Sequence, residues 1–412
     1  MRILIYSYNY HPEPIGIAPL MTELAEGLVQ RGHRVRVVTA MPWYPESEIY
    51  EPYRGKLYLT EERNGVKIQR CYVRCSPKRS LFNRALFELS FASLSFFQAL
   101  MGWRPDVILL TVPGLPVGVP ASLLGWIYRC PVVLNLQDIL PDAAVHVGLI
   151  TSKKAIAIFS ALEKYNYWMA RQISVIAEGF RDNLLEKGVA DQKITLIPNW
   201  VKVDFIKPYP RDNNYFRSSY HLNDKFVVLY SGNIALTQGI ETVIDAATYL
   251  QDTPDIQLVI VGEEKRLEKL EKYRQKQQVG NVTLCPFQPR EKLPEMLSAA
   301  DVGLVVQKSN VVAFNMPSKI QVLLSSGRAI IGSVPAIGTA AKALKASGGG
   351  VVIPPEDPAA LAEAIRDLYN HPEKVKELGQ NSRQYAIENY SFESALDRYE
   401  QLFQSFKQKL KP

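Results

Sequence analysis

The sequence predicts an α/β protein built from two doubly wound domains, each with a parallel sheet. Short apolar runs alternate with segments of helical spacing over residues 1–197, and the same alternation restarts at residue 226. Between these halves, residues 199–224 are rich in Pro, Asn, Asp and Tyr without a clear period, which is typical of a linker. Strands that alternate with helices form crossover units, and such units build a parallel sheet covered on both faces.

The elements of the first half follow from its apolar runs. Residues 2–8 predict a buried strand, and Leu20, Leu24 and Leu28 then recur at the four-residue spacing of a helix. Gly32 ends that helix, and 35–40 is the next predicted strand. Further strands are expected at 107–111, 132–136, 173–177 and 194–197, with a core helix at about 117–128.

The second half repeats the pattern with shorter connections. Strands are predicted at 226–231, 256–261, 282–286, 302–306, 329–333 and 351–353. Helices are predicted at 239–250, 265–277, 293–300, 317–326 and from Pro358 onward. We therefore expect an N-terminal domain at 1–200, a C-terminal domain at 201–390, and a helix at 391–412 that packs back towards the N-terminal domain. Ligands of such sheets bind at the carboxyl ends of the strands, so a cleft between two facing domains is expected.

Composition excludes several classes of protein. With 47% hydrophobic and 22% charged residues in 412, the chain matches soluble globular proteins rather than disordered or fibrous ones. A net charge of +7 is too small to indicate nucleic-acid binding by itself. The four cysteines, with Cys71 and Cys75 in one predicted strand, form no Cys-x-x-Cys pair and suit a reducing cytoplasm. No cluster has the spacing of metal ligands, so we expect no metal.

Two segments raise the question of a membrane, although no signal peptide is predicted. Residues 107–128 carry no charge, but Pro113, Pro116 and Pro120 favour a strand, a loop and a core helix over a membrane span. Residues 54–84 hold nine Lys or Arg against two Glu, and the apolar segment 85–103 follows. This composition is typical of docking on anionic lipid, and a solvated strand edge before a core helix explains it equally well.

The first half offers three kinds of candidate site residue. It contains neither Gly-x-Gly-x-x-Gly nor a Walker loop, which argues against a dinucleotide-dependent or P-loop enzyme. Gly16 precedes a helix whose N-terminus suits a phosphate, although a plain turn glycine fits the spacing equally well. Asp138 follows the strand 132–136, where a carboxylate suits a sugar hydroxyl or the role of a base. Asp142 in the same segment suits a helix N-cap.

The second half contains three turns that suit a phosphorylated ligand. Gly232, Asn233 and Gln238 lie where a strand ends and backbone N–H groups converge. Gly262 ends the next strand, beside Glu263, and leaves room for a flat ring. Lys319 begins a helix after Pro317 and Ser318 and, with Lys308, provides positive charge for a phosphate. The alternative explanation is that the glycines are ordinary turn residues and that Lys319 is a solvated lysine at a helix start.

Together these segments resemble glycosyltransferase family 4, the retaining enzymes with the GT-B fold. The resemblance covers nearly the whole chain and is carried by residues 28–35, 197–204, 230–233, 261–263, 293–301, 326–331 and 352–357. Within the family, the chain is similar to the branch that contains the colanic-acid fucosyltransferase and related O-antigen transferases. The segments that carry this similarity are residues 8–16, 137–142, 231–239, 307–308 and 317–319.

The chain departs from the family pattern at two pairs of positions. Where many members have Arg and Lys against the donor pyrophosphate, this sequence has Asn233 and Gln238. Where many have two Glu eight positions apart, it has Phe314 and Val322. A valine cannot hydrogen-bond a ribose, and Lys319 and Lys308 are expected to supply the missing positive charge.

The resemblance implies a metal-independent retaining glycosyltransferase, in which the nucleoside diphosphate leaves and the acceptor hydroxyl attacks on the same face. The implied donor is GDP-fucose or a UDP-sugar, and the implied acceptor is a lipid-linked glycan of exopolysaccharide or lipopolysaccharide assembly at the cytoplasmic face of the membrane. Lys319 and Asp138 are the expected catalytic residues. The expected donor-side residues are Gly16, Gly232, Asn233, Gln238, Gly262, Glu263, Lys308, Pro317, Ser318 and Lys319. The expected acceptor-side residues are His11, Glu13 and Asp138.

Two other functions fit the same predicted shape. A sugar-nucleotide epimerase of this fold would act on the donor without an acceptor. A catalytically silent partner would bind a sugar nucleotide within an assembly complex, which the departures at Phe314 and Val322 leave open.

Overall fold

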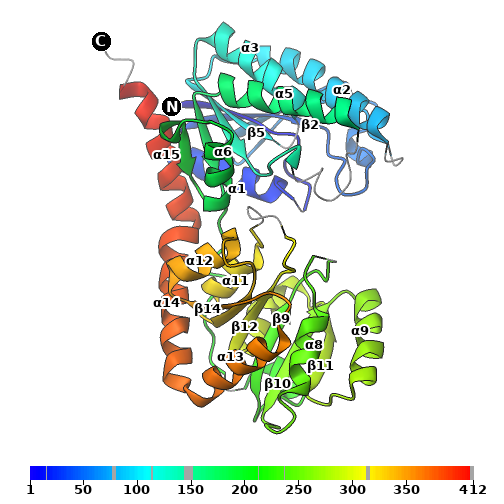
Figure 1. Ribbon diagram of the computed structural model, residues 1–412. Helices are drawn as coiled ribbons and strands as arrows, with labels where there is room; N and C mark the ends of the chain where they lie inside the picture. Colours follow the sequence, from blue (N-terminus) through cyan, green and yellow to red (C-terminus); the bar gives the residue numbers. More distant parts are fainter. Residues whose placement is uncertain are drawn as a thin grey trace. The chain divides into compact units, whose positions relative to one another are not determined.

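The computed structural model describes residues 1–14, 16–76, 80–112, 115–142, 152–211, 213–235, 237–311 and 316–408. The chain divides into two compact units (Figure 1). The first unit comprises Met1–Ile176, Phe180–Asn199 and Leu396–Pro412. The second comprises Ala177–Gly179 and Trp200–Ala395. Each unit contains its own β-sheet, and most or all of its strands are parallel, which confirms the predicted fold class of two parallel-sheet α/β domains.

The first unit is built on an eight-stranded sheet in the order β3-β4-β2-β1-β5-β6-β7-β8. All neighbouring pairs are parallel except the β3–β4 hairpin, which the sequence analysis did not predict. Asn64 and Gly65 connect this hairpin, both with positive φ, as a two-residue hairpin turn requires. The strands are β1 (Arg2–Tyr6), β2 (Arg34–Ala40), β3 (Tyr58–Arg63), β4 (Val66–Cys71), β5 (Val107–Val112), β6 (Val132–Leu136), β7 (Gln172–Val175) and β8 (Ile194–Leu196).

Helices cover both faces of this sheet. They are α1 (Ala18–Gln30), α2 (Leu81–Leu100), α3 (Gly118–Tyr128), α5 (Lys153–Met169), α6 (Glu178–Glu186) and α15 (Phe392–Gln408). Figure 1 shows α2, α3 and α5 side by side over one face and α1 on the other. Within the segment 107–128 the structure has the predicted strand, β5, and the predicted helix, α3. Across the described ranges no helix has both the length and the apolar character that a membrane span needs.

The basic segment 54–84 does not form one free basic surface, contrary to what its composition suggests. Arg70 is buried on β4 and pairs with Glu61 at 2.6 Å. Arg63 pairs with Glu26 at 2.8 Å and also lies 3.2 Å from His11. Lys78 and Arg79 lie outside the described residues. Arg70 is paired within the β3–β4 hairpin and Arg63 with a residue of α1, so sequence counting overstated the free charge.

The two neighbouring cysteines also differ from expectation. Cys71 is the last residue of β4, and Cys75 lies beyond the strand. Both thiols are free, and burial raises their pKa values, that of Cys75 to about 12. The interpretation of one strand carrying both residues was therefore wrong, because β4 ends at Cys71.

The second unit is built on a parallel sheet in the order β11-β10-β9-β12-β13-β14. The chain starts in the middle at β9, runs outwards to β11, and returns to the other side of β9 at β12. The strands are β9 (Phe226–Ser231), β10 (Ile256–Gly262), β11 (Val282–Pro286), β12 (Val302–Val306), β13 (Ala329–Ser333) and β14 (Gly350–Ile353). All six lie where the sequence predicts them, and the reversal at β9 makes its carboxyl end the expected ligand crevice.

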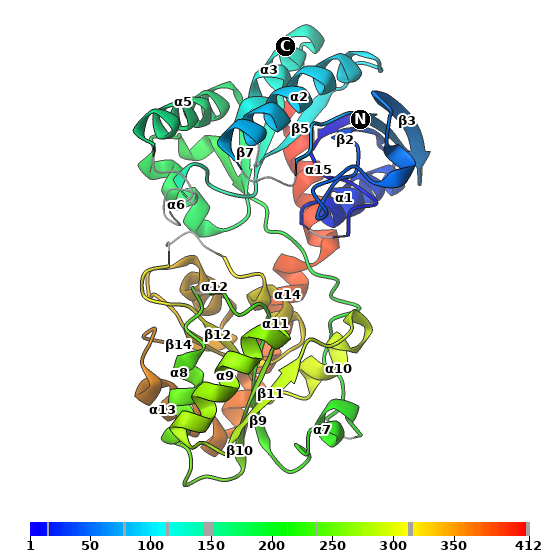
Figure 2. The same ribbon diagram turned by 90° about the vertical axis from the view of Figure 1, so that its right-hand side faces the viewer.

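Apolar side chains on alternate strand positions form a core on each face of this sheet. Val228 and Tyr230 of β9 point to one core, which contains residues of α8 and α13. Val227 and Leu229 point to the other, which contains residues of α10 and α11. The helices are α7 (Tyr215–Ser219), α8 (Glu241–Thr248), α9 (Glu264–Gln277), α10 (Leu293–Ser298), α11 (Lys319–Ser325), α12 (Thr339–Ser347), α13 (Pro358–Asn370) and α14 (Pro372–Tyr390). Figure 2 shows α9 and α8 near β9–β11.

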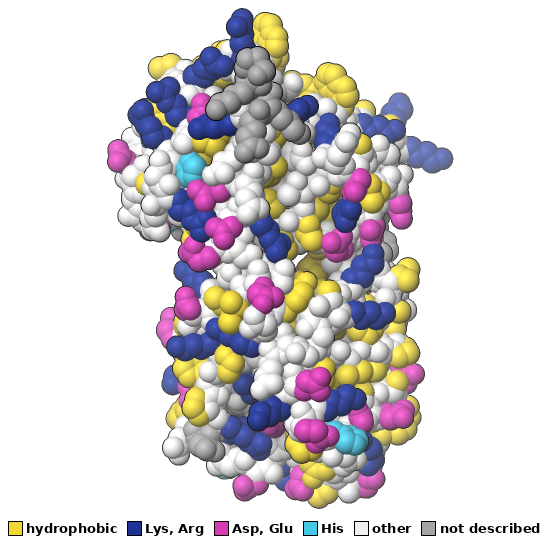
Figure 3. Space-filling view, turned by 90° about the vertical axis from the view of Figure 1, so that its left-hand side faces the viewer, with side chains coloured by type: hydrophobic (Ala, Val, Ile, Leu, Met, Phe, Trp, Pro, Cys, Tyr) yellow, Lys and Arg dark blue, Asp and Glu magenta, His cyan; other side chains and the backbone are white. Residues whose placement is uncertain are grey.

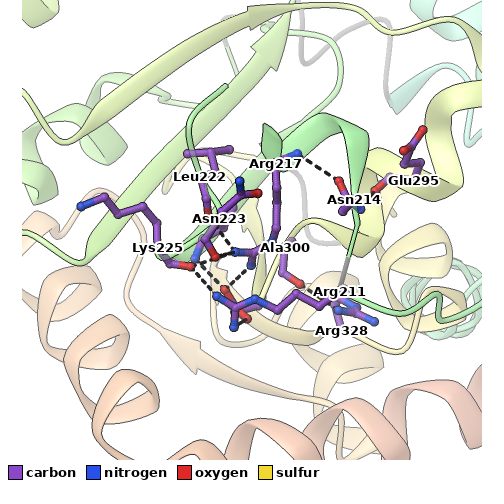
Figure 4. Close-up of polar contacts among 11 residues, drawn as sticks. Arg211, Asn214, Arg217, Leu222, Asn223, Lys225, Glu295, Ala300 and Arg328 are labelled. Atoms are coloured by element: carbon purple, nitrogen blue, oxygen red, sulfur yellow. Dashed lines mark hydrogen bonds and ion pairs between the residues drawn. The ribbon is translucent and has the colours of Figure 1, made fainter. Parts of the chain in front are cut away.

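The predicted linker 199–224 is a folded part of the second unit rather than a free connection. It contains α7, whose Arg217 is 1% exposed. The Arg217 guanidinium donates to the backbone oxygens of Leu222 and Lys225, both at 2.9 Å (Figure 4). It also pairs with Asp301 at 2.7 Å, and Asp301 accepts the backbone N–H of Val227 at 2.7 Å. The segment is thereby attached to the sheet through contacts between residues distant in sequence.

Candidate functional site

The candidate site of the second unit lies where β9 and β12 end. These strands pair only at Val302–Val228 and Gly303–Leu229, whereas β9 stays paired with β10 from Phe226 to Ser231. The ladder between β9 and β12 therefore stops before the strands reach their carboxyl ends. A sheet opens in this way at the point where its strand order reverses, which is where α/β proteins bind ligands.

A turn that begins and ends with glycine follows β9. Gly232 has φ +138° and Gly239 has φ +61°, values that side chains of L-residues rarely adopt. The Gly232 N–H donates to the Val261 oxygen at 3.1 Å, and the Lys308 N–H donates to the Thr237 oxygen at 2.9 Å. The turn is thus attached to the ends of β10 and β12. Asn233 within it is exposed.

Lys319 lies against the first glycine of this turn. Its Nζ is 3.8 Å from the centroid of the Tyr230 ring and donates to Gln238 Oε1 at 3.0 Å. A Cβ on Gly232 would come within 3.3 Å of the same Nζ. Among the described residues no carboxylate pairs with Lys319, and burial lowers its pKa to about 7. The site therefore holds a desolvated lysine that lacks a counter-ion of its own.

Lys308 lies against the second glycine. A Cβ on Gly239 would come within 3.2 Å of the Lys308 Cγ, so the lysine stem packs over the turn. Its side chain is partly exposed. The two lysines thus flank the 232–239 turn at its two ends. The Tyr230 hydroxyl donates to Gln238 Oε1 at 2.8 Å, and because Lys319 donates to the same oxygen, the Gln238 amide connects the lysine to the tyrosine.

The remaining donor-side residues of the second unit lie nearby, with two differences from expectation. Gly262 ends β10, but the Ile234 side chain occupies the space that a Cβ would need, at 2.3 Å. The glycine therefore makes room for Ile234 rather than leaving a surface for a flat ring. The helix begins at Lys319, so Pro317 and Ser318 precede it instead of opening it. Glu263 is exposed beside Gly262.

In the first unit, Glu13 is buried and fully bonded. Its Oε1 accepts the N–H groups of Trp43 and Tyr44, both at 2.9 Å, and its Oε2 accepts the Asn9 amide at 2.9 Å. Burial raises the pKa of this carboxyl, while the backbone N–H groups counteract the rise. The side chain attaches the loop after β2 to the loop after β1, so its predicted acceptor-side role would require this bonding to change.

The other first-unit candidates lie on the loops after β1 and β6. His11 lies 3.2 Å from Arg63, and burial together with that arginine lowers the pKa of its imidazole. Asp138 is an exposed residue after β6, yet neighbouring protein partly desolvates its carboxyl and raises its pKa. Gly16 has φ +71° and precedes α1. It belongs to the first unit, unlike the other donor-side residues.

Sequence reasoning missed Tyr230 as a site residue. The signal was available, because Tyr230 is an aromatic residue near the carboxyl end of β9, directly before the turn that contains the predicted donor-side residues. Of the departures from the family pattern, Phe314 lies outside the described residues. Val322 is a residue of α11 and packs against the apolar core on that face of the sheet. Over the described ranges, no three or more His, Cys, Asp or Glu gather where a metal ion could be held.

Two family models match the chain. The model described as glycosyl transferase 4-like domain matches residues 16–200, and the model described as glycosyl transferases group 1 matches residues 212–385. The two matches fall one on each half of the chain and together leave only the ends and a short connection uncovered.

Similar proteins match most or nearly all of the chain. The putative colanic acid biosynthesis glycosyl transferase WcaI of Escherichia coli K12 is 33% identical over 97% of this chain and 98% of its own. The probable glycosyltransferase WbjE of Pseudomonas aeruginosa is 24% identical over 73% of this chain and 72% of its own. Among solved structures, HepE of Anabaena in complex with UDP has a TM-score of 0.71 at 16% identity, covering 98% of this chain and 100% of HepE.

Proposed function

Since this chain belongs to glycosyltransferase family 4 and is an enzyme with the GT-B fold, we propose that it transfers a sugar from a nucleotide-diphospho-sugar with retention of configuration. The second unit binds the donor and the first unit presents the acceptor. The acceptor is a lipid-linked glycan of exopolysaccharide or lipopolysaccharide assembly. The similarity to WcaI, a putative colanic acid biosynthesis glycosyl transferase, supports this process, and the UDP in the HepE complex supports a nucleoside diphosphate as the leaving group.

The observation that carries the proposal is Lys319. A desolvated lysine that lacks a carboxylate partner among the described residues is costly unless a ligand supplies the negative charge. A diphosphate placed between Lys319 and the 232–239 turn supplies it. As the bond to the sugar breaks, charge accumulates on the leaving diphosphate, and a preorganised cation stabilises that charge. Lys308 at the other end of the turn adds a second cation, so the chain's own residues provide this stabilisation.

The departures from the family pattern acquire a physical role in this arrangement. Gln238 replaces a cation, and its amide oxygen accepts from Lys319 and from Tyr230. We assign Gln238 and Tyr230 as positioning residues that hold Lys319 over the turn. Asn233, which is exposed in the turn, provides an amide for a phosphate oxygen. On the acceptor side, we assign Asp138, on the loop after β6, to the attacking hydroxyl, because a carboxylate can accept the proton that the hydroxyl loses.

The test is the replacement Lys319→Ala, with Lys345→Ala as the matched control on an exposed lysine of the same unit. Thermal stabilisation by UDP, GDP, ADP and dTDP identifies the base that binds wild type. We expect Lys319→Ala to weaken binding of that nucleotide about tenfold and to lower turnover of the corresponding sugar nucleotide by a factor of about 10² or more. Wild-type affinity and turnover in Lys319→Ala contradict the proposal.

Incubation with the sugar nucleotide alone separates transfer from epimerisation. Transfer predicts an unchanged donor apart from slow hydrolysis, and consumption only when a lipid-linked acceptor is added. An isomerised sugar nucleotide in the absence of acceptor shows an epimerase instead. If the protein binds the nucleotide but consumes no sugar nucleotide, with or without a lipid-linked acceptor, it is a silent binding protein.

A further inference from the structure

An exposed apolar surface covers the helix layer α2–α3–α5 of the first unit. Roughly half of the exposed large hydrophobic side chains among the described residues lie on these three helices. They include Trp126 at 80% exposure and Trp168 at 75%. We define the helix-layer surface by the exposed apolar residues Phe82, Leu89, Phe97, Leu100, Val119, Leu123, Trp126, Ile127, Ile158 and Trp168.

On each helix the exposed apolar residues share one side. Val119, Leu123, Trp126 and Ile127 recur at i, i+4, i+7 and i+8, which places them on one stripe of α3. At about 100° per residue, Phe82, Leu89, Phe97 and Leu100 fall within an arc of about 80° on α2. Because α2 packs beside α3 and α3 beside α5, these stripes form one continuous surface. Apolar area of this kind marks a binding surface.

The charges of this surface all have one sign. The exposed charged side chains of α5 are Lys153, Lys154 and Lys164, and α3 has none, whereas Arg84 of α2 lies on the side opposite its apolar stripe. The carboxylates of these helices are buried: Glu88 pairs with Arg84 and Tyr8, and Glu163 pairs with Tyr167 and Lys187. The upper margin of Figure 3, where the first unit lies, likewise carries mainly hydrophobic and Lys or Arg side chains.

Each helix of the layer also ends with a bulky exposed residue followed by an arginine. Met101, Trp126 and Trp168 are at least 75% exposed, and Arg104, Arg129 and Arg171 follow them three residues later, all exposed. Exposed tryptophan and arginine side chains suit the boundary between the headgroups and the acyl chains of a bilayer.

We propose that the helix-layer surface docks this protein on an anionic lipid bilayer. Apolar side chains enter the interface, and lysines pair with anionic headgroups. A second copy of the chain does not fit, because two copies would bring cations against cations. The sequence-based suggestion placed docking on residues 54–103, whereas the structure assigns it to the outer faces of α2, α3 and α5 and leaves the paired charges of the β3–β4 hairpin out.

This inference adds a site of action to the proposed function, but its test needs neither donor nor acceptor. The purified full chain is sedimented with vesicles of phosphatidylglycerol and phosphatidylcholine, and with vesicles of phosphatidylcholine alone. We expect binding to the anionic vesicles and about hundredfold weaker binding when Lys153, Lys154 and Lys164 are changed to Gln, since each cation near an anionic surface contributes about fivefold. Replacing Lys269, Lys272 and Lys276 on α9 by Gln is the matched control.

The apolar contribution is tested by the double variant Trp126→Ser/Trp168→Ser. We expect loss of vesicle binding and of the blue shift in tryptophan emission that accompanies it, with an unchanged melting temperature, because both rings are exposed. Ile337→Ser, at a 79% exposed residue of the second unit, is the control and should bind as wild type does. Wild-type binding by either helix-layer variant overturns the proposal. So does equal binding to both kinds of vesicle, or self-association of the chain without vesicle binding.

Discussion

At the scale of single residues, Lys319 connects the structure to pH dependence. Burial lowers its pKa from 10.5 to about 7, so between these values the unfolded chain binds more protons and stability rises with pH. A bound diphosphate favours the charged lysine. We therefore predict uptake of about one proton per nucleoside diphosphate at pH 8, measured by calorimetry in buffers of different ionisation enthalpy. Lys319→Ala should abolish this uptake, and the same uptake in both proteins would contradict the assignment.

Gly262 allows a second prediction at this scale. An alanine there would place its Cβ 2.3 Å from Ile234 Cδ1, so Gly262→Ala should destabilise the protein by about 1–3 kcal/mol through overpacking. Ile234→Val removes that carbon atom, and in the double variant it should recover part of the loss. A double-mutant cycle in urea measures this coupling. Additive effects would mean that another contact requires the glycine.

At the scale of elements, the attachment of α7 to the sheet depends on one carboxylate. Asp301 pairs with the buried Arg217 and accepts the Val227 N–H that begins β9. Removing one partner of a buried pair leaves the other charge uncompensated, so Asp301→Ala should cost about 3–5 kcal/mol of unfolding free energy. Asp252→Ala, which breaks an exposed pair with Arg366, should leave the urea midpoint unchanged. Similar midpoints for the two variants would show that α7 is held by other contacts.

At the scale of the whole molecule, two units with separate sheets predict a localised response to ligand. A nucleoside diphosphate at a hundred times its dissociation constant should stabilise the folded chain by about 2.7 kcal/mol. Hydrogen exchange should slow at residues 230–239 and in α11 of the second unit, because the proposed site contains the turn and Lys319. Protection confined to the first unit would place the nucleotide elsewhere.

The sequence by itself determined the parallel strands of both sheets and most helices, since hydrophobic period and helix-ending glycines are local properties, but it missed the β3–β4 hairpin and α7. It also indicated Lys319, Lys308 and the 232–239 turn, because these motifs lie within short segments. Only the tertiary structure decided the partners: Tyr230 beneath Lys319, Ile234 in the space beside Gly262, and Glu13 bonded to Trp43 and Tyr44. It also decided which side of each apolar helix faces water. Such contacts join residues far apart along the chain, and no local pattern specifies which distant side chain fills a given space.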